Sequence, residues 1–302
     1  MGVKPWIKAM RLRTLPLAAS CVFAGAACSM YQSPYPWKIF GLALFTTVLL
    51  QILSNFANDY GDFAKGTDNE NRVGPQRALQ SGAITAGQMK VAIIINVILA
   101  LMSGIILLWV SYEATQETLG LWILLGIGVL SIAAAYKYTA GDNAYGYSGL
   151  GDISVFLFFG LVGVMGNAYL YRGDFTPDSI FPAIGVGCLS TAVLNLNNLR
   201  DHVNDAASGK RTRVVKMGFS KGKEYQLWLI LIGANFALLS VFVMAKSWYH
   251  YLPILALVPL VIHAKKVMRT ENPADLDPEL KKVALVTFAF SLLLWLTQVV
   301  VG

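Results

Sequence analysis

Nine apolar segments follow one another along the chain, separated by shorter polar loops. A helix needs ~20 apolar residues to cross the hydrocarbon core of a bilayer, and most of the segments approach that length. The pattern predicts membrane-spanning helices near 14–32, 39–58, 91–111, 119–136, 153–171, 179–197, 225–245, 250–264 and 283–301. The eighth segment is short, so we expect it to be tilted or to extend over Lys265 and Lys266, whose charged ends can reach the membrane surface.

Composition narrows the protein class further. Of 302 residues, 56% are hydrophobic and only 14% are charged, whereas soluble domains have ~25% charged residues. Nine spans use up most of the chain and leave no room for a separate soluble domain. We therefore expect an all-α, polytopic membrane protein with one domain over 1–302. Cys21, Cys28 and Cys188 lie in apolar segments without a metal-binding spacing, which favours buried hydrophobic roles.

Basic residues are distributed unevenly between the two sides of the predicted spans. When the N-terminus and every second loop are placed on one side, all but three of the 24 lysines and arginines fall there, the exceptions being Lys38, Arg172 and Lys246. Cytoplasmic loops are enriched in these residues, so we expect a cytoplasmic N-terminus and an external C-terminus. The same pattern favours a retained first span over a cleaved signal peptide. The basic loops would also face the anionic lipids of the cytoplasmic leaflet. This accounts for much of the net charge of +7 without a nucleic-acid partner.

Two clusters of asparagine and aspartate follow the second and sixth segments, on the predicted cytoplasmic side. Residues four apart on a helix share a face. This spacing relates Asn58 to Asp62 in the first cluster, and Asn197, Asp201 and Asp205 in the second. The recurrence four spans apart indicates a pseudo-repeat, and it predicts that the two clusters face each other at one membrane edge.

The clusters suggest a metal site. Neighbouring carboxylates repel one another unless a cation joins them, and oxygen-only ligands suit Mg²⁺, which also binds substrate phosphates. We expect Asp68 to be a further ligand candidate, and Lys65, Arg77 and Arg200 to bind a diphosphate. Asn55 and Asp59 lie on another helical face, and we expect them to support the metal ligands or to cap the helix. The alternative, that all these side chains only cap helices, is less favoured because the pattern occurs twice.

A third cytoplasmic segment, 136–152, is rich in tyrosine. Lys137, Tyr138 and Tyr147 are candidates for contacts with an aromatic or anionic acceptor. Tyrosines also gather at membrane interfaces without any catalytic role, and composition alone leaves both interpretations open.

Several motifs together resemble the UbiA superfamily of intramembrane aromatic prenyltransferases. These are Arg-Leu-Arg-Thr-Leu-Pro-Leu at 11–17, Asn-Asp-Tyr-Gly-Asp at 58–62 with Lys-Gly-Thr-Asp at 65–68, Gly-Pro-Gln-Arg at 74–77, Tyr-Gly-Tyr-Ser-Gly-Leu-Gly-Asp at 145–152 and Asn-Asn-Leu-Arg-Asp at 197–201. The combination is similar to the branch that acts on 1,4-dihydroxy-2-naphthoate, and it extends over essentially the whole chain. The superfamily's commonest first motif, Asn-x-x-x-Asp-x-x-x-Asp, has its second aspartate where this chain has Gly66. The longer gap to Asp68 is also a feature of the naphthoate branch.

The resemblance implies nine helices around a central cavity with a lateral opening to lipid. It implies Mg²⁺-dependent transfer of a polyprenyl group from its diphosphate to 1,4-dihydroxy-2-naphthoate. The carboxylate is lost, giving demethylmenaquinone for menaquinone (vitamin K₂) biosynthesis in the bacterial inner membrane. We expect Asp62, Asp201, Lys65 and Arg77 to matter most for catalysis. The expected partners are the two substrates and membrane lipid, with no obligatory protein partner.

Three alternatives remain at this point. A related enzyme could prenylate another aromatic acceptor, such as 4-hydroxybenzoate, with the same metal chemistry. A CDP-alcohol phosphotransferase also places aspartates at a membrane edge, but in a single motif, so two clusters argue against it. A cation transporter usually places its charged ligands near the bilayer midplane, whereas the acids here lie at one edge.

Overall fold

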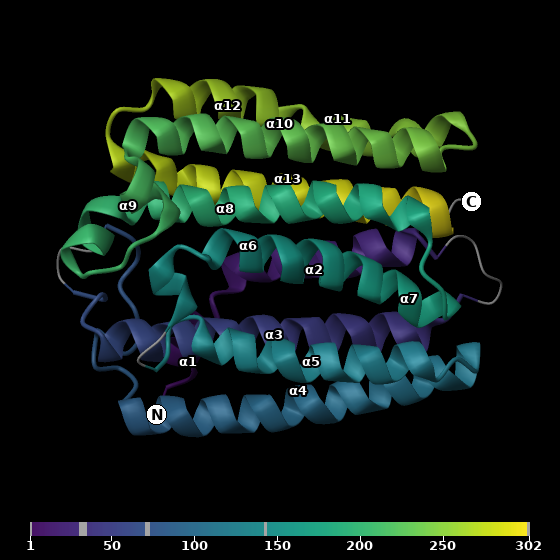
Figure 1. The fold of residues 1–302 in the computed structure, drawn as a ribbon, viewed down its shortest axis with the longest axis horizontal. Coiled ribbons are helices and arrows are strands. Elements are labelled where there is room, and N and C mark those ends of the chain that lie inside the picture. The colour runs from purple at the N-terminus through teal and green to yellow at the C-terminus, as the bar shows by residue number, and fades with distance from the viewer. Residues whose placement is uncertain (1, 30–34, 70–72, 142–143, 301–302) are drawn as a thin grey trace.

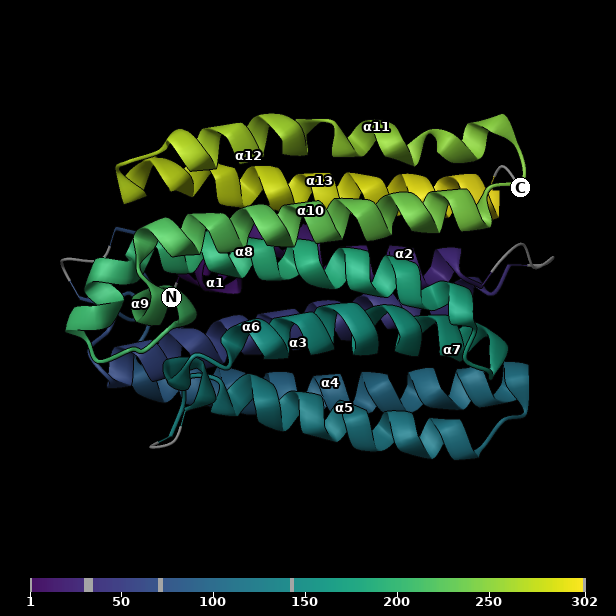
Figure 2. The same ribbon diagram turned by 45° about the horizontal axis from the view of Figure 1, so that its top comes forward.

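The computed structural model describes residues 2–29, 35–69, 73–141 and 144–300, and this part of the chain is helical without any strand. The long helices run along one common direction, so their connections gather at the two ends of the bundle (Figures 1 and 2). The helices are α1 (Val3–Met10), α2 (Leu15–Ala27), α3 (Trp37–Ala64), α4 (Ala86–Thr115), α5 (Leu119–Lys137), α6 (Gly151–Val155), α7 (Gly166–Arg172), α8 (Ile180–Ala207), α9 (Arg213–Met217), α10 (Phe219–Met244), α11 (Pro253–Leu257), α12 (Pro259–Arg269) and α13 (Asp277–Trp295).

Eight stretches of the described residues are long and apolar enough to cross a membrane. They are Trp37–Ala64, Ala86–Thr115, Leu119–Lys137, Gly151–Arg172, Pro177–Ala207, Phe219–Met244, Trp248–Arg269 and Pro273–Val299. Each matches one of the nine predicted segments, so the all-α polytopic fold is confirmed. The remaining predicted segment, the first, corresponds to α2.

Helix α2 is shorter than the predicted segment, and it is an inner helix of the bundle. It has 13 residues, and most of them are buried. It packs against α3, α8, α13 and the π-helical segment η3 (Phe156–Met165). Small side chains allow such close packing between membrane helices, and alanine, glycine, serine and cysteine make up most of α2. Positions 30–32 of the predicted segment lie outside the described residues.

The eighth predicted segment is interrupted and longer than its apolar core. It consists of a short 3₁₀ turn, Trp248–Tyr251, followed by α11 and α12. Because a proline ring removes a backbone donor, the helix restarts at Pro259. Helix α12 then continues past Lys265 and Lys266 to Arg269, as the extension hypothesis predicts.

Helix α8 lies at the centre of the bundle, where it packs against α10, α13 and η3. A Cβ atom at Gly160 of η3 would lie 2.6 Å from the carbonyl oxygen of Ala183, so glycine permits this direct helix contact. Helix α3 packs mainly against α4, with further contacts to α2 and α5.

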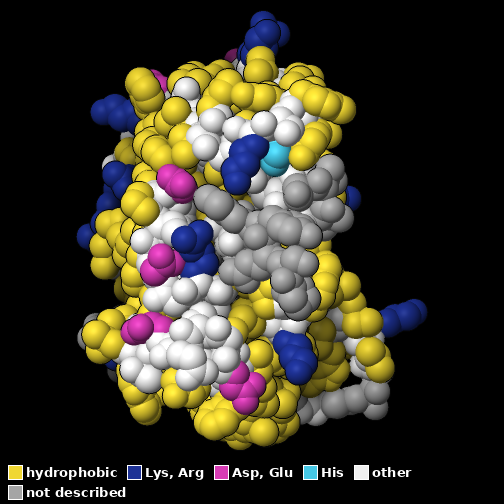
Figure 3. Space-filling model, turned by 90° about the vertical axis from the view of Figure 1, so that its right-hand side faces the viewer, with side chains coloured by type: hydrophobic (Ala, Val, Ile, Leu, Met, Phe, Trp, Pro, Cys, Tyr) yellow, Lys and Arg dark blue, Asp and Glu magenta, His cyan; other side chains and the backbone are white. Residues whose placement is uncertain are grey.

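Helices α3 and α8 both end at the same end of the bundle, which brings the two acidic clusters to one side. The C-terminus lies at the opposite end (Figure 1). Viewed from that opposite end, the visible charged side chains are scattered among hydrophobic and uncharged atoms (Figure 3). The two acidic clusters therefore share one end because α3 and α8 run in the same direction.

Candidate active site

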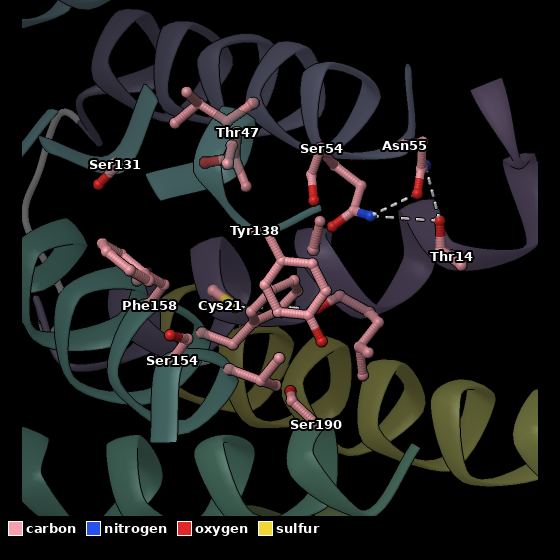
Figure 4. A pocket seen from close by; sticks show the side chains of 18 of the residues that line it. Thr14, Cys21, Thr47, Ser54, Asn55, Ser131, Tyr138, Ser154, Phe158 and Ser190 are labelled. Carbon is pink, nitrogen blue, oxygen red and sulfur yellow. Dashed lines mark hydrogen bonds between the residues drawn. The ribbon is translucent and has the colours of Figure 1, made fainter. Parts of the chain in front are cut away.

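A cavity of about 560 Å³ lies inside the bundle, and α2, α3, α4, α5, η3, α8 and α13 all contribute to its wall (Figure 4). Much of the wall is formed by leucine, isoleucine, valine, alanine and phenylalanine. Both acidic clusters reach the same cavity. Asn58 and Asp62 come from α3, and Asn197, Asp201 and Asp205 come from α8. The helical spacing read from the sequence thus corresponds to a shared, cavity-facing surface.

Asp62 is buried and is held by two side chains, Tyr147 behind the cavity wall and Lys210 in it. The Tyr147 hydroxyl donates to Asp62 Oδ1 at 2.8 Å, and Lys210 Nζ lies 3.6 Å from the same oxygen. Burial raises the pKa of Tyr147, and the negative charge of Asp62 raises it further, so the phenol keeps its proton. Lys65 Nζ lies 4.1 Å from the centre of the Tyr147 ring. Neither Lys65 nor Tyr147 is part of the cavity wall, so Tyr147 orients Asp62 from outside and Lys65 packs on the Tyr147 ring.

Asp201 is oriented by its neighbour Arg200. Arg200 Nε and Nη2 donate to the two carboxylate oxygens of Asp201 at 2.9 and 2.6 Å, and Nη2 also donates to Asn197 Oδ1 at 2.8 Å. Arg200 further pairs with Asp277 at the start of α13. Its guanidinium is buried and lies outside the cavity wall. The sequence suggests that Arg200 binds a diphosphate. To do so, Arg200 would have to give up its contacts with Asp201, Asn197 or Asp277.

Two arginines are anchored at the cavity wall by acids behind them. Asp59 is 1% exposed and pairs with Arg11, and Arg77 Nη1 lies 3.5 Å from the same carboxylate oxygen. Arg77 Nε also lies 3.8 Å from Asp68 Oδ1. Arg11 and Arg77 line the cavity, whereas Asp59 and Asp68 do not. Asp59 thus lies behind the wall, as expected from its helical face, and Asp68 does too. Asn55, which was expected to share the position of Asp59, instead lines the cavity (Figure 4).

The tyrosine-rich segment meets α3 through Thr139. The Thr139 hydroxyl lies 3.0 Å from the carbonyl oxygen of Ala57 and 3.2 Å from Asn58 Oδ1. A Cβ atom at Gly61 would come within 2.5 Å of the Thr139 backbone, so a larger residue there would push this segment away. The contact places Tyr138 in the cavity wall (Figure 4). The adjacent Lys137 is exposed and does not reach the cavity.

Sequence reasoning missed several polar residues of this wall, including three at its charged end. Arg11, Asn198 and Lys210 all line the cavity. Arg11 belongs to the first motif of the resemblance, and Asn198 adjoins Asn197, so both had a signal in the sequence. Lys210 lies in the loop after α8, where helical periodicity gives no information.

The charged end of the cavity offers oxygen donors for a cation. Within the described ranges, no three side chains of Asp, Glu, His or Cys converge closely enough to hold a metal ion by themselves. The wall instead combines carboxylate oxygens of Asp62, Asp201 and Asp205 with amide oxygens of Asn58 and Asn197. Such oxygen donors, completed by water and phosphate, fit Mg²⁺, which usually retains waters and shares substrate phosphates.

A charged, oxygen-rich end joined to apolar walls inside membrane-spanning helices defines an intramembrane enzyme for a substrate with an anionic head and a hydrocarbon tail. Residues 18–297 match the UbiA prenyltransferase family. The chain belongs to this family, which argues against the cation-transporter and CDP-alcohol phosphotransferase alternatives.

Curated relatives cover nearly the whole chain. The 1,4-dihydroxy-2-naphthoate octaprenyltransferase of Haemophilus influenzae is 42% identical over 293 residues, which are 96% of this chain and 94% of the relative. The enzyme of the same name from Escherichia coli K12 is 42% identical over 298 residues, covering 97% and 96%.

Solved structures show the same fold at low sequence identity. A UbiA homologue from Archaeoglobus fulgidus, bound to GPP and Mg²⁺, has a TM-score of 0.64 at 13% identity, covering 96% of this chain and 99% of that one. A digeranylgeranylglyceryl phosphate synthase has a TM-score of 0.60 at 16% identity, covering 98% of both chains.

Proposed function

We propose that this protein transfers a polyprenyl group from polyprenyl diphosphate to 1,4-dihydroxy-2-naphthoate, with loss of the carboxylate, in menaquinone biosynthesis. The observation that carries the proposal is the meeting of the α3 and α8 clusters at one end of an otherwise apolar cavity. The names of the relatives that are 42% identical support the choice of acceptor.

Asn58, Asp62, Asn197, Asp201 and Asp205 would hold Mg²⁺, with Asp68 as a further candidate that also supports Arg77. The metal would supply positive charge that stabilises the departing diphosphate. The solved homologue with GPP and Mg²⁺ is consistent with a divalent cation at such a site.

Basic side chains at the same end of the cavity would bind the diphosphate. Arg77, Arg11 and Lys210 already line the wall, and an arginine can hold two phosphate oxygens at once. Lys65 and Arg200 would act indirectly, Lys65 through the Tyr147 ring and Arg200 through Asp201. These groups would lie where negative charge develops on the departing diphosphate, which would favour bond cleavage electrostatically.

The reaction balances without a further reactant. The allylic carbon–oxygen bond breaks, and diphosphate leaves with the electron pair. The ring carbon that bears the carboxylate attacks the allylic carbon, and the electrons of the carbon–carboxylate bond return to the ring as CO₂ departs. The apolar walls exclude water from the allylic cation and so suppress hydrolysis. Tyr138, in the wall, would contact the acceptor, while Lys137 and Tyr147 would act only after rearrangement.

The charge distribution supports an orientation in a bacterial inner membrane. The end that carries the acidic clusters is also the end where the basic loops gather, so it would face the cytoplasm with the N-terminus. The C-terminus would then lie outside.

The direct test is turnover by purified protein in detergent with Mg²⁺ and a short allylic diphosphate. 1,4-Dihydroxy-2-naphthoate and 4-hydroxybenzoate are supplied in parallel, and products are weighed by mass spectrometry. A prenylated naphthoquinol that lacks the carboxyl mass is the expected product. Product with hydroxybenzoate alone would overturn the acceptor, and absence of both product and diphosphate release would overturn the reaction.

Tyr147→Phe is expected to raise the Mg²⁺ concentration needed for half-maximal turnover by about tenfold, because residues that orient a metal ligand typically change metal affinity by 10- to 100-fold. The variant removes the 2.8 Å hydrogen bond to Asp62 but keeps the ring beneath Lys65. The measurement is a Mg²⁺ titration of initial rate. The exposed Tyr136→Phe is the matched control, and identical titrations for all three proteins would contradict this role.

A further inference from the structure

Ser190 of α8 has a buried hydroxyl that faces the cavity without a partner. The residue is 1% exposed and belongs to the cavity wall. Its Oγ atom makes no hydrogen bond within the described part of the chain. In the close view its oxygen points into the pocket, on whose wall Tyr138 and Ser154 also lie (Figure 4).

Several other helical hydroxyls of this protein are satisfied locally. The buried hydroxyl of Ser291 in α13 also makes no hydrogen bond within the described residues, but Ser291 lies outside the cavity wall. Thr191, the next residue, donates to the Gly187 carbonyl at 2.8 Å, and Ser20 donates to the Pro16 carbonyl at 2.9 Å. Ser131 shares the cavity wall with Ser190 yet donates to the Ile127 carbonyl at 2.7 Å. Helical serines readily bond to the carbonyl one turn before, and an unsatisfied buried hydroxyl is costly. The hydroxyl of Ser190 is therefore available to a ligand.

The position of Ser190 in the cavity indicates which substrate its hydroxyl would bind. Ser190 shares the helical face of Asn197 and Asp201 and lies two turns before Asn197, about 10 Å along the axis. Ser190 is thus close to the diphosphate end of the cavity without being part of it. The reacting carbon of the prenyl group and the acceptor ring would lie in this region. A hydrocarbon tail has no atom that could satisfy a hydroxyl. A ring hydroxyl of the aromatic acceptor can both donate and accept.

We propose that the Ser190 hydroxyl hydrogen-bonds a ring hydroxyl of the aromatic acceptor and determines specificity for it. The inference rests on the proposed function, because it assumes an acceptor of that class. Ser190 positions the ring and takes no part in bond making or breaking. An acceptor that lacks the bonded hydroxyl leaves Ser190 unsatisfied, so the site discriminates against it.

The test compares Ser190→Ala with the wild type and with Ser20→Ala, a buried helical serine outside the cavity wall. Acceptor binding to the detergent-solubilised protein is measured by isothermal titration calorimetry, so the result does not depend on turnover. The ligands are 1,4-dihydroxy-2-naphthoate, 1-hydroxy-2-naphthoate and 4-hydroxy-2-naphthoate. We expect Ser190→Ala to raise Kd for the dihydroxy acceptor about tenfold. Kd should stay unchanged for the monohydroxy analogue that lacks the bonded hydroxyl, because that analogue has no hydrogen bond to lose. KM for the prenyl diphosphate should not change.

Equal weakening of all three ligands, no weakening at all, or a raised KM for the prenyl diphosphate would overturn the role of Ser190. Wild-type protein that binds the naphthoate with this Ser190 dependence but forms no product would overturn the proposed reaction alone. Wild-type protein that binds none of the three ligands would overturn both proposals.

Discussion

Asp62→Asn is expected to lower prenyl transfer at least about a hundredfold, the size of effect seen when one electrostatic stabilising group is removed from an active site. The substitution keeps the shape of the side chain but removes its charge at the point where Tyr147 and Lys210 converge. A cation held at this site would lose an anionic ligand, and Lys210 loses its charge partner. The rate is measured at limiting and at saturating Mg²⁺, with melting temperature as the measure of folding.

Asp275→Asn is the matched control, because Asp275 is an exposed aspartate away from the cavity wall. We expect it to retain wild-type turnover. Full activity of Asp62→Asn at both Mg²⁺ concentrations would show that the α3 cluster does not serve the metal.

Glu279→Ala is expected to cost about 3 kcal/mol of folding free energy, as removal of one partner from a buried ion pair typically does. Glu279 is 1% exposed. It accepts hydrogen bonds from His263 Nδ1 and Lys282 Nζ, both at 2.6 Å, and Lys266 Nζ lies 3.3 Å away. The loss should appear as a melting temperature several degrees lower in detergent.

The same carboxylate anchors a chain of polar contacts across four helices. His263 Nε2 lies 3.2 Å from Gln226 Nε2, and Gln226 Oε1 accepts a hydrogen bond from Asn195 of α8 at 2.9 Å. Glu279→Ala removes the acceptor at the end of this chain. The exposed Glu271→Ala serves as the control. Equal melting temperatures for the two variants would mean that the network contributes little to stability.

Hydropathy alone located the spans, because burying a helix in lipid requires a continuous apolar stretch whatever its neighbours are. Two of the predicted spans differ in length from their apolar segments. Helix α2 looks like an ordinary span but is a short inner helix, and its small side chains become informative only beside the helices that they touch. The eighth span continues beyond its apolar core because charged side chains at its end can reach the membrane surface.

The local sequence determined the helical faces of Asn58 and Asp62 and of Asn197, Asp201 and Asp205, since residues four apart share a face wherever the helix lies. Tertiary structure decided which partners these side chains meet. It paired Arg200 with Asp201 and Asp277, set Asp59 behind Arg11 and Arg77, left Lys137 outside, and left the Ser190 hydroxyl for a ligand. Periodicity is a property of one helix. A cavity and its charge pairs arise only where helices distant in sequence pack together.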